Sequence, residues 1–371
     1  MRSDSVIIVG AGPAGAATAL ALARASIPVT LVERAAFPRR KVCGEYLGGG
    51  AVAALDALGL GERVRALGSP LRGIRINTGG MRVELAFSRP ALALARATLD
   101  NVILEAALGA GVQLYNGRVE DVFERGVAVR DASGERVRLQ GRFLIGADGA
   151  GSIVARKLGL SRPLPLHPRF AVGGHFRGVD DTHGCVEMYC DGKTYLAINP
   201  LGGGVANVMA VAPKGRLETW SRVMDFAAEA RSGPRVAVGP LTHDVRRTTA
   251  TGTLLVGDAA GFLSPFTGQG VFLALRSAER ASAALIAAFA NASAEAEHLR
   301  AYDREHRREL RVRARLGKIV DTLIAVPFLA RRAARKLEAS PALAAILLDA
   351  VGGSISADAA LRPAVLRRLL A

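Results

Sequence analysis

The sequence lacks the features that mark disulfide-rich and membrane-spanning proteins. Its three cysteines, Cys43, Cys185 and Cys190, are too few for a disulfide framework. No apolar run reaches the roughly 18 residues that a membrane-spanning helix needs, and the longest candidate, 281–290, is rich in alanine and follows charged residues. No signal peptide is visible, because the chain enters a predicted strand almost at once. These absences predict a cytoplasmic protein.

Lysine and aromatic residues are also scarce. Only six residues are lysine and 5% are aromatic, yet the chain carries 49 basic against 33 acidic residues and a net charge of +16. The aromatic residues do not alternate with the basic runs, so platforms for base stacking are not expected and nucleic-acid binding is disfavoured. The arginine excess either reflects genome composition or makes a basic surface that attracts anionic lipid or an acidic carrier protein.

The histidines do not suggest a metal site. There are six of them, and their spacing matches no common ligand pattern. His183 lies near Cys185 and Cys190, but the alternating residues 185–190 are typical of a β-strand. We therefore expect no bound metal.

The N-terminal region carries the strongest positive signal. Four apolar residues at 6–9 predict a buried parallel strand, and residues 14–25 predict a helix. The intervening G-x-G-x-x-G motif at 10–15 lets backbone N–H groups approach a pyrophosphate at the helix N-terminus. Glu33 ends a second predicted strand, where a carboxylate can accept hydrogen bonds from an adenosine ribose. A glutamate there favours FAD or NAD over NADP.

Two more glycine-rich turns follow predicted buried strands. The strand at 143–145 leads into Asp148-Gly149, and the strand at 253–256 leads into Gly257-Asp258 and a further turn at 264–270. In parallel α/β sheets such turns lie at the carboxyl edge, where ligands bind. The sequence therefore predicts a Rossmann-like α/β domain with a parallel sheet.

The chain changes character near residue 163. Alternating segments over 170–212 and a strand pair at 71–85 predict an antiparallel sheet, and helices are predicted at 91–108 and 217–231. We predict a discontinuous FAD-binding domain at 1–70, 90–162 and 246–297, a substrate domain at 71–89 and 163–245, and an arginine-rich helical region at 298–371. The helices of the last region either pack one face on the core, or also contact a membrane surface or an acidic partner.

In their order, the three turns resemble the FAD-dependent group that includes the class A flavoprotein monooxygenases and the geranylgeranyl reductases, over about residues 5 to 290. The resemblance implies an FAD site built from the turns and their neighbours: Gly10, Gly12, Ala14, Gly15, Glu33, Arg34, Arg96, Asp148, Gly257, Asp258, Pro265, Gly268, Gln269 and Gly270. It places Arg96 near the phosphates and Asp258 on a ribityl hydroxyl. The helix that begins at Gly270 would stabilise negative charge on the flavin. Two alternatives stay open, a loop cap for Asp148 and a surface charge for Arg96.

The substrate side resembles the reductase branch in two segments. Residues 41–45, with Lys41, Cys43 and Glu45, are similar to a motif that stands near the flavin there, and 195–200 are similar to that branch's tyrosine-to-proline substrate motif. Two aromatic positions of the second motif are Ala197 and Asn199 here, which suggests a wider or more polar pocket.

The catalytic candidates are Cys43, Glu45 and Tyr195. Cys43 could be a proton donor, a redox thiol or a small buried side chain. Glu45 could act as an acid or a base, or could only hold the loop.

The preferred hypothesis is an FAD-dependent monooxygenase or oxidoreductase. NAD(P)H would bind transiently and reduce the flavin, since no second nucleotide-binding unit is visible, and an apolar, aromatic or polyketide-like molecule would be oxidised. One alternative is C=C reduction of the geranylgeranyl reductase type, and another is a basic adaptor that binds a membrane or carrier protein. Halogenation is disfavoured because its positioned lysine is missing: after Lys41 the next lysine is Lys157, and the sole tryptophan, Trp220, stands alone.

Overall fold

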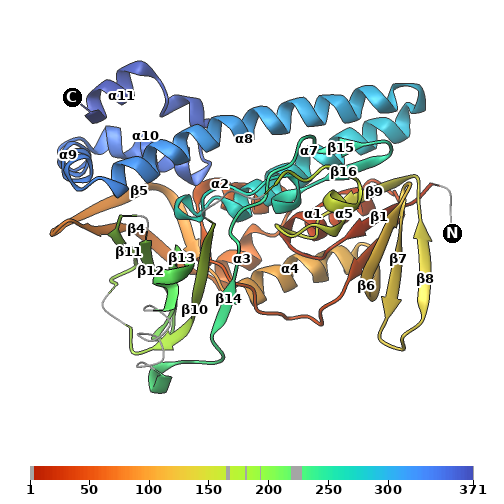
Figure 1. Ribbon diagram of the computed structural model, residues 1–371, viewed down its shortest axis with the longest axis horizontal. Helices are drawn as coiled ribbons and strands as arrows, with labels where there is room; N and C mark the ends of the chain where they lie inside the picture. The colour runs from red at the N-terminus through yellow and green to blue at the C-terminus, as the bar shows by residue number, and fades with distance from the viewer. Residues whose placement is uncertain (1–3, 164–167, 180–181, 193, 219–227, 371) are drawn as a thin grey trace.

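The computed structural model describes residues 4–163, 168–179, 182–192, 194–218 and 228–370. Within these residues the chain forms two large sheets that lie next to each other, with a long C-terminal helix running past both (Figure 1). The first sheet is mostly parallel and the second mostly antiparallel. The candidate site described below lies where they meet.

The first sheet carries the three glycine-rich turns. In order across it, the strands are β15 (Thr249–Ala250), β16 (Thr253–Leu255), β9 (Phe143–Gly146), β1 (Val6–Val9), β2 (Val29–Glu33), β6 (Gln113–Phe123), β7 (Gly126–Asp131) and β8 (Arg136–Gln140). Neighbours from β16 to the start of β6 are parallel, with Ile8 level with Leu31 and Ile145. Their carboxyl ends therefore share one edge.

Both faces of the parallel region are covered, which explains its continuous apolar strands. Ile8 and Leu31 pack with helices α1 (Pro13–Arg24), α4 (Arg96–Gly109) and α7 (Gly270–Ala290). Ile7 and Leu144 pack with α5 (Ile153–Lys157) and the β7–β8 ribbon on the other face. All four side chains are fully buried, and each contributes roughly 2 kcal/mol through its apolar area.

The second sheet joins segments that are far apart in the sequence. Its strands in order are β14 (Val236–Val238), β10 (Arg169–Arg177), β13 (Val205–Pro213), β12 (Thr194–Gly202), β11 (Cys185–Asp191), β4 (Ser69–Thr78), β5 (Met81–Ala93) and β3 (Tyr46–Leu47). The β11–β4 pair is parallel and the others are antiparallel.

The remaining helices frame the two sheets. α2 (Gly49–Ala57) and α3 (Gly61–Leu67) follow β3, and α8 (Glu295–Ala325) packs on α7. α9 (Pro327–Glu338), α10 (Pro341–Gly352) and α11 (Pro363–Leu370) gather at the far end of α8, near β4 and β5 (Figure 1). Short 3-10 turns are η1 (Ala228–Ala230), η2 (Gly257–Ala260), η3 (Pro265–Thr267), η4 (Ala292–Ala294) and η5 (Ala357–Ala359). None of the described helices combines the length and apolar character needed to cross a membrane.

The predicted fold class is confirmed, with a parallel sheet, an antiparallel sheet and a helical C-terminal region. The predicted start of the helix at 91–108 is wrong. Leu92 and Ala93 complete β5, where they pair with β4, and the helix begins at Arg96. Strand pairing here overrides the helix propensity of alanine and leucine. The domain boundaries stay a prediction.

The helix predicted at 217–231 is only partly described. Residues 214–218 are helical, residues 219–227 lie outside the described part of the chain, and η1 follows.

Candidate functional site

The turn after β1 contains two glycines, Gly10 and Gly15, at which a side chain has no room. Gly10 has a φ of 101°, and a Cβ on it would lie 2.6 Å from the Ala147 carbonyl oxygen. A Cβ on Gly15 would overlap the Gly10 carbonyl oxygen. Gly12 is the N-cap of α1, whose first turn holds no acidic residue. The N-terminal N–H groups of α1 are therefore positioned to bind an anion.

Glu33 closes one end of this turn. Its carboxylate accepts hydrogen bonds from the backbone N–H groups of Ala11, Arg34 and Ala35, each at 2.9 Å. The side chain is buried, and a carboxylate has further lone pairs for ribose hydroxyls. The Arg34 side chain, in contrast, is exposed.

Three cations gather in front of the glycine turns. Arg39 Nη2 lies 3.7 Å from Asp100 Oδ2 and 3.6 Å from the place where a Cβ on Gly12 would be. Arg96 makes a two-pronged contact with Asp100, at 2.8 and 3.0 Å. Lys41 Nζ lies 3.6 Å from the Cβ position of Gly149. The Arg39 Nε group is buried and has no hydrogen-bond partner among the described residues.

The electrostatics of this group favour an anionic ligand. Burial and then repulsion by Arg96 lower the pKa of Lys41, while attraction by Asp258 and Asp100 opposes this shift. The Lys41 side chain is nevertheless exposed to solvent, so it lies in a pocket that is surrounded by protein and open on one side. A diphosphate would relieve the repulsion between the cations and would accept the unused Arg39 N–H. These residues fit the pyrophosphate of FAD.

The third turn approaches from the neighbouring strand. A Cβ on Gly257 would lie 2.8 Å from Ala14 Cβ, so η2 packs directly on α1. β16 and β2 are three strand positions apart, which separates the ends carrying Asp258 and Glu33 by roughly 14 Å. An extended dinucleotide can reach both.

The turn at 265–270 leads into α7. Pro265 opens η3, and Gly268 takes a left-handed φ of 63°. Nothing lies within 4 Å of a Cβ on Gly270, so the N-terminus of α7 is accessible. The Gln269 side chain turns elsewhere, because its Oε1 accepts a hydrogen bond from Arg313 of α8 at 2.7 Å.

Asp148 is placed as a helix cap. Its carboxylate accepts hydrogen bonds from Ser152 Oγ and from the Ile153 backbone N–H, both at 2.6 Å. Burial raises its pKa although these hydrogen bonds oppose the shift. This geometry matches the loop-cap alternative; contact between Asp148 and FAD stays a prediction.

The 43–45 loop holds a second cluster. Glu45 Oε2 lies 2.7 Å from His175 Nε2 of β10, and Glu45 Oε1 accepts a hydrogen bond from the Arg96 backbone N–H at 2.8 Å. The Glu45 N–H donates to Cys43 Sγ at 3.3 Å. Glu45 has a φ of 56°, a strained conformation for a non-glycine residue that is common at functional sites.

Two asparagines of the second sheet fix this loop. Asn199 Nδ2 donates to the carbonyl oxygens of Gly44 and Glu45, at 3.0 and 2.8 Å. Asn207 Nδ2 donates to the Cys43 carbonyl oxygen at 2.7 Å. The sequence position of Asn199 had suggested a more polar pocket. Its side chain is buried, so it anchors the loop and does not make the pocket floor polar.

A cavity of about 230 Å³ opens beside the loop. It is lined by Arg40, Lys41, Cys43, Glu45, Ala97, Gly174, His175, Asn207, Met209, Pro234 and Val236. Burial disfavours the charged Arg96 guanidinium behind Cys43, but Asp100 and Cys43 outweigh that effect and raise its pKa. The structure thus brings Cys43 and Glu45 together at one cavity.

Tyr195 lies apart from this cavity. It is buried in β12 and meets the Phe266 ring edge-on, with the centroids 5.1 Å apart. Burial raises its pKa. Through Phe266 it supports the η3 turn, and a catalytic role for Tyr195 stays a prediction.

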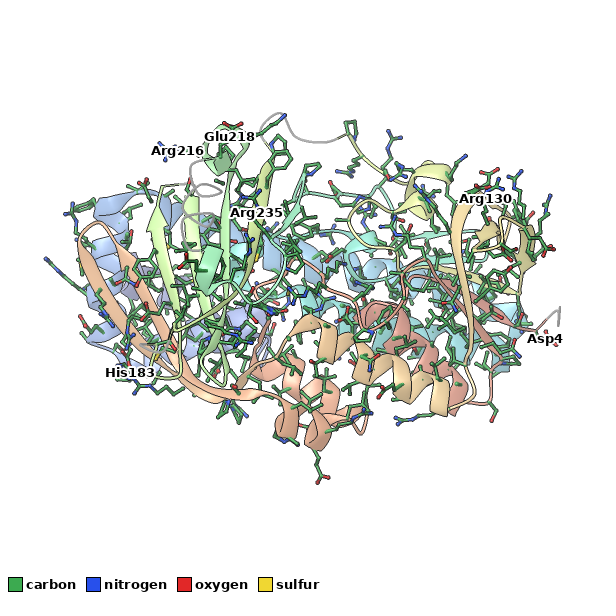
Figure 2. All side chains as sticks on the ribbon, turned by 90° about the horizontal axis from the view of Figure 1, so that it is seen from below. Asp4, Arg130, His183, Arg216, Glu218 and Arg235 are labelled. Atoms are coloured by element: carbon green, nitrogen blue, oxygen red, sulfur yellow. The ribbon has the colours of Figure 1, made fainter. Side chains whose placement is uncertain are left out.

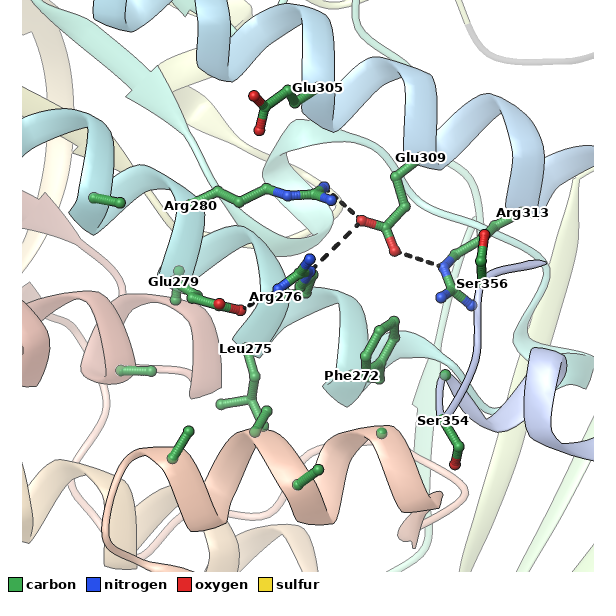
Figure 3. A pocket seen from close by; sticks show the side chains of 18 of the residues that line it. Phe272, Leu275, Arg276, Glu279, Arg280, Glu305, Glu309, Arg313, Ser354 and Ser356 are labelled. Carbon is green, nitrogen blue, oxygen red and sulfur yellow. Dashed lines mark hydrogen bonds and ion pairs between the residues drawn. The ribbon is translucent and has the colours of Figure 1, made fainter. Parts of the chain in front are cut away.

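A larger cavity, about 1020 Å³, lies elsewhere, between α1, α2, α7 and α8 (Figure 3). Several of its charged groups are paired with one another. Arg280 and Arg313 contact Glu309 at 2.5 and 3.0 Å, and Arg276 contacts Glu279 at 2.6 Å. We assign the site to the smaller cavity, because Lys41, Cys43 and Glu45 line it and Lys41 also lies beside the Gly149 turn.

Sequence reasoning missed several residues of the site. Arg39 follows Glu33 closely and had a signal in the basic run 39–41. His175 and Asn207 had none, because only the fold brings them to residues more than 100 positions away. No group of three metal-ligating side chains exists in the part of the chain that the structure describes.

Comparison with known proteins places this geometry in context. A family model described as an FAD binding domain matches residues 3–315. The chain is 32% identical over 313 residues to menaquinone reductase of Mycobacterium tuberculosis, covering 72% of this chain and 73% of that one. It is 26% identical to digeranylgeranylglycerophospholipid reductase 1 of Methanothermobacter thermautotrophicus, covering 82% of each.

A solved structure adds a third chemistry to these relatives. The flavin-dependent halogenase CmlS matches with a TM-score of 0.75 and 26% identity, over 84% of this chain. This chain spans 63% of the halogenase, less than two thirds of its length.

Proposed function

The chain belongs to the FAD-binding domain family of flavin-dependent oxidoreductases, and on that premise we propose that it reduces a carbon–carbon double bond in an apolar, isoprenoid-like substrate. The observation that carries the proposal is the Glu45 cluster. Glu45 lies between His175 and the start of α4, next to Cys43, and all three side chains line one cavity. Saturating a C=C bond consumes one hydride and one proton. Bound FAD, once reduced, supplies hydride chemistry.

The residues of the chain divide the remaining work. The turn at 10–15, Arg39 and Lys41 would bind the pyrophosphate, and Glu33 the ribose. Cys43 or the Glu45–His175 pair would hold the proton that the substrate carbon receives. His175 is the partly exposed member, with 20% of its side chain accessible, so it can take up a replacement proton from water.

Some of the relatives support a reductase, while others are named as halogenases. Two similar proteins are named as reductases, of menaquinone and of a geranylgeranyl lipid. Two positions of the sequence, Ala197 and Asn199, spoke against such a substrate, and the amide of Asn199 is occupied with the loop backbone. An apolar pocket is therefore compatible with this sequence.

Monooxygenation is the second candidate, favoured by the polar groups of the cavity, Lys41 and Asn207, which suit a substrate with hydrogen-bonding groups.

Halogenation is disfavoured on the chemistry of lysine. Lys157 forms an exposed pair with Asp121 at 2.9 Å, away from the site. Lys41 does line the cavity, but we assign it to the pyrophosphate of FAD, where it would not be free to carry an oxidised halogen. A purely non-enzymatic adaptor would be supported by a purified protein without flavin colour.

Anaerobic turnover tests the proposal. The flavin-containing protein would be reduced with NADH or NADPH under nitrogen and mixed with a menaquinone or with geranylgeraniol. We expect a product that carries two added hydrogen atoms on its isoprenoid chain, and not on a quinone ring, in the absence of oxygen. A product that forms only in air and gains one oxygen atom from labelled O2 would overturn the reductase proposal in favour of monooxygenation. Comparing the two nicotinamide donors, and dithionite, identifies the electron source.

A further inference from the structure

The end of the molecule formed by α9 and α11 has an exposed cationic surface with an exposed apolar residue in the first turn of α9. On α9, Phe328, Arg331, Arg335 and Lys336 are exposed. Phe328 is 64% exposed, the highest value among the large hydrophobic side chains of the described residues. We infer that this surface, which we call the α9 face, docks the protein on an anionic lipid bilayer.

The geometry of α9 fixes which side faces outward. Ala330, Ala333, Ala334 and Leu337 are buried against the body of the protein, at three- and four-residue spacing. Phe328, Arg331 and Arg335 lie at positions i, i+3 and i+7, on the opposite side of the same helix. The helix cannot turn its apolar stripe toward a membrane, so attraction must come from the cations, with Phe328 inserted among the head groups.

The charge balance of this end is one-sided. α9 and α11 together hold six cations, Arg331, Arg332, Arg335, Lys336, Arg367 and Arg368, and one acid, Glu338. The two helices are in contact. Two exposed arginines elsewhere are matched by acids: Arg130, at the end formed by the first sheet (Figure 2), lies 2.6 Å from Glu120, and Arg65 lies 2.6 Å from Asp56. The α9 face therefore complements an anionic surface better than these regions do.

An acidic carrier protein is the other partner that a basic surface could attract. The exposed Phe328 and the adjoining Val326, 40% exposed, favour lipid, because an interface lined by head groups accepts a single aromatic side chain without a matching pocket. The inference does not depend on the reaction that the protein catalyses.

Vesicle co-sedimentation of the full-length, flavin-containing protein tests this inference. Vesicles of phosphatidylcholine with phosphatidylglycerol should bind the protein, vesicles of phosphatidylcholine alone should not, and salt should release it. The variant Arg331→Gln/Arg335→Gln/Lys336→Gln should bind the anionic vesicles roughly 100-fold more weakly. Phe328→Ser should weaken binding roughly tenfold, with a loss that persists at higher salt.

A matched variant separates the α9 face from overall basicity. Arg300, Arg304 and Arg311 are exposed on one stripe of α8, so changing all three to Gln removes the same charge from a helix surface. That variant should keep near-normal binding. Equal losses in the two triple variants, or no binding of the wild type to anionic vesicles, would overturn the inference. Retention on immobilised acyl carrier protein without vesicle binding would overturn it too, in favour of a protein partner.

Discussion

The carboxyl edge of the first sheet and the 43–45 loop beside it are held in place by different kinds of contact. At the edge, the contacts lie within and between neighbouring turns: Gly10 lies against the Ala147 carbonyl, and the Glu33 carboxylate accepts hydrogen bonds from three backbone N–H groups. In the loop, side chains from distant strands do the positioning, with Asn199 and Asn207 holding its carbonyl groups. The edge suits a constant cofactor, and the loop suits chemistry that differs between relatives.

This difference predicts where single substitutions act. A change at the edge has no room and should remove the cofactor, whereas a change in the loop should leave the cofactor bound and alter the reaction. Loops on a rigid scaffold commonly carry the specific function of a fold. The variants below test that division.

The largest effect is expected from Gly15→Val. Its side chain would overlap the Gly10 carbonyl oxygen, and forcing the turn apart should cost about 3 kcal/mol of stability or more. The protein should purify without flavin absorbance and with a lowered melting temperature. Gly109→Ala, at the end of α4 where a Cβ meets open space, is the control and should keep its flavin. A yellow, stable Gly15→Val protein would show that the edge is less constrained than its contacts indicate.

A smaller effect, on the rate and not on cofactor binding, is expected from Glu45→Gln. Loss of the carboxylate breaks the charge-assisted contact with His175 and should slow substrate reduction roughly 100-fold. Stopped-flow absorbance should show an unchanged rate of flavin reduction by the nicotinamide donor. Because Glu45 and His175 act as a pair, Glu45→Gln/His175→Asn should be no slower than the worse single variant. Equal slowing of both half-reactions would contradict a role limited to the substrate step.

The same division explains what could be predicted from the sequence. The edge was predictable, because strand, glycine turn, helix and acid follow one another within residues 6–33 and each has a local signal. The cluster at Glu45 was only half predictable. Cys43 and Glu45 stand together in the chain, but His175 is 130 positions from Glu45. A contact between residues so far apart leaves no pattern in the local sequence, and an isolated histidine can have many roles.

The sequence was also misleading where tertiary contacts override local preference. Residues 91–93 have helix-forming side chains but pair with β4 in the second sheet. Asn199 looked like a polar substitution in a substrate motif, and it is an anchor for the Gly44 and Glu45 carbonyls. In both cases the deciding partner lies far along the chain.

The cations between the two regions should have an intermediate effect on cofactor affinity. Arg39→Gln and Lys41→Gln each remove one charge facing the glycine turns, and each should weaken FAD binding roughly tenfold. Titration of the flavin-free protein with FAD, followed by flavin fluorescence, measures this. Arg34→Gln is the matched control: Arg34 also follows Glu33, but, unlike Arg39 and Lys41, its side chain is not among the atoms nearest to the glycines of the turns, so affinity should hardly change. A larger loss of FAD affinity in Arg34→Gln than in Lys41→Gln would show that the phosphates bind nearer to Arg34 than to Lys41.

The smallest effect concerns the stability of the protein at acidic pH. It decides whether the pH dependence of activity reflects the catalytic loop or the unfolding of the whole protein. His306 of α8 is 2% exposed, stacks on Tyr302, and its Nε2 has no hydrogen-bond partner among the described residues. Burial, and then repulsion by Arg280, lower its pKa from 6.5 to about 4. Between these values the unfolded chain holds a proton that the folded protein does not, so stability falls as the pH falls.

The expected contribution of His306 is a loss of roughly 1 kcal/mol between about pH 7 and pH 5.5. His306→Phe keeps a ring against Tyr302 and removes the titration, so its free energy of unfolding, measured with urea across this range, should fall less steeply with acid than that of the wild type. Its activity profile should then report the catalytic loop alone. An identical pH slope in the two proteins would mean that other groups control acid stability, and that His306 does not confound the comparison.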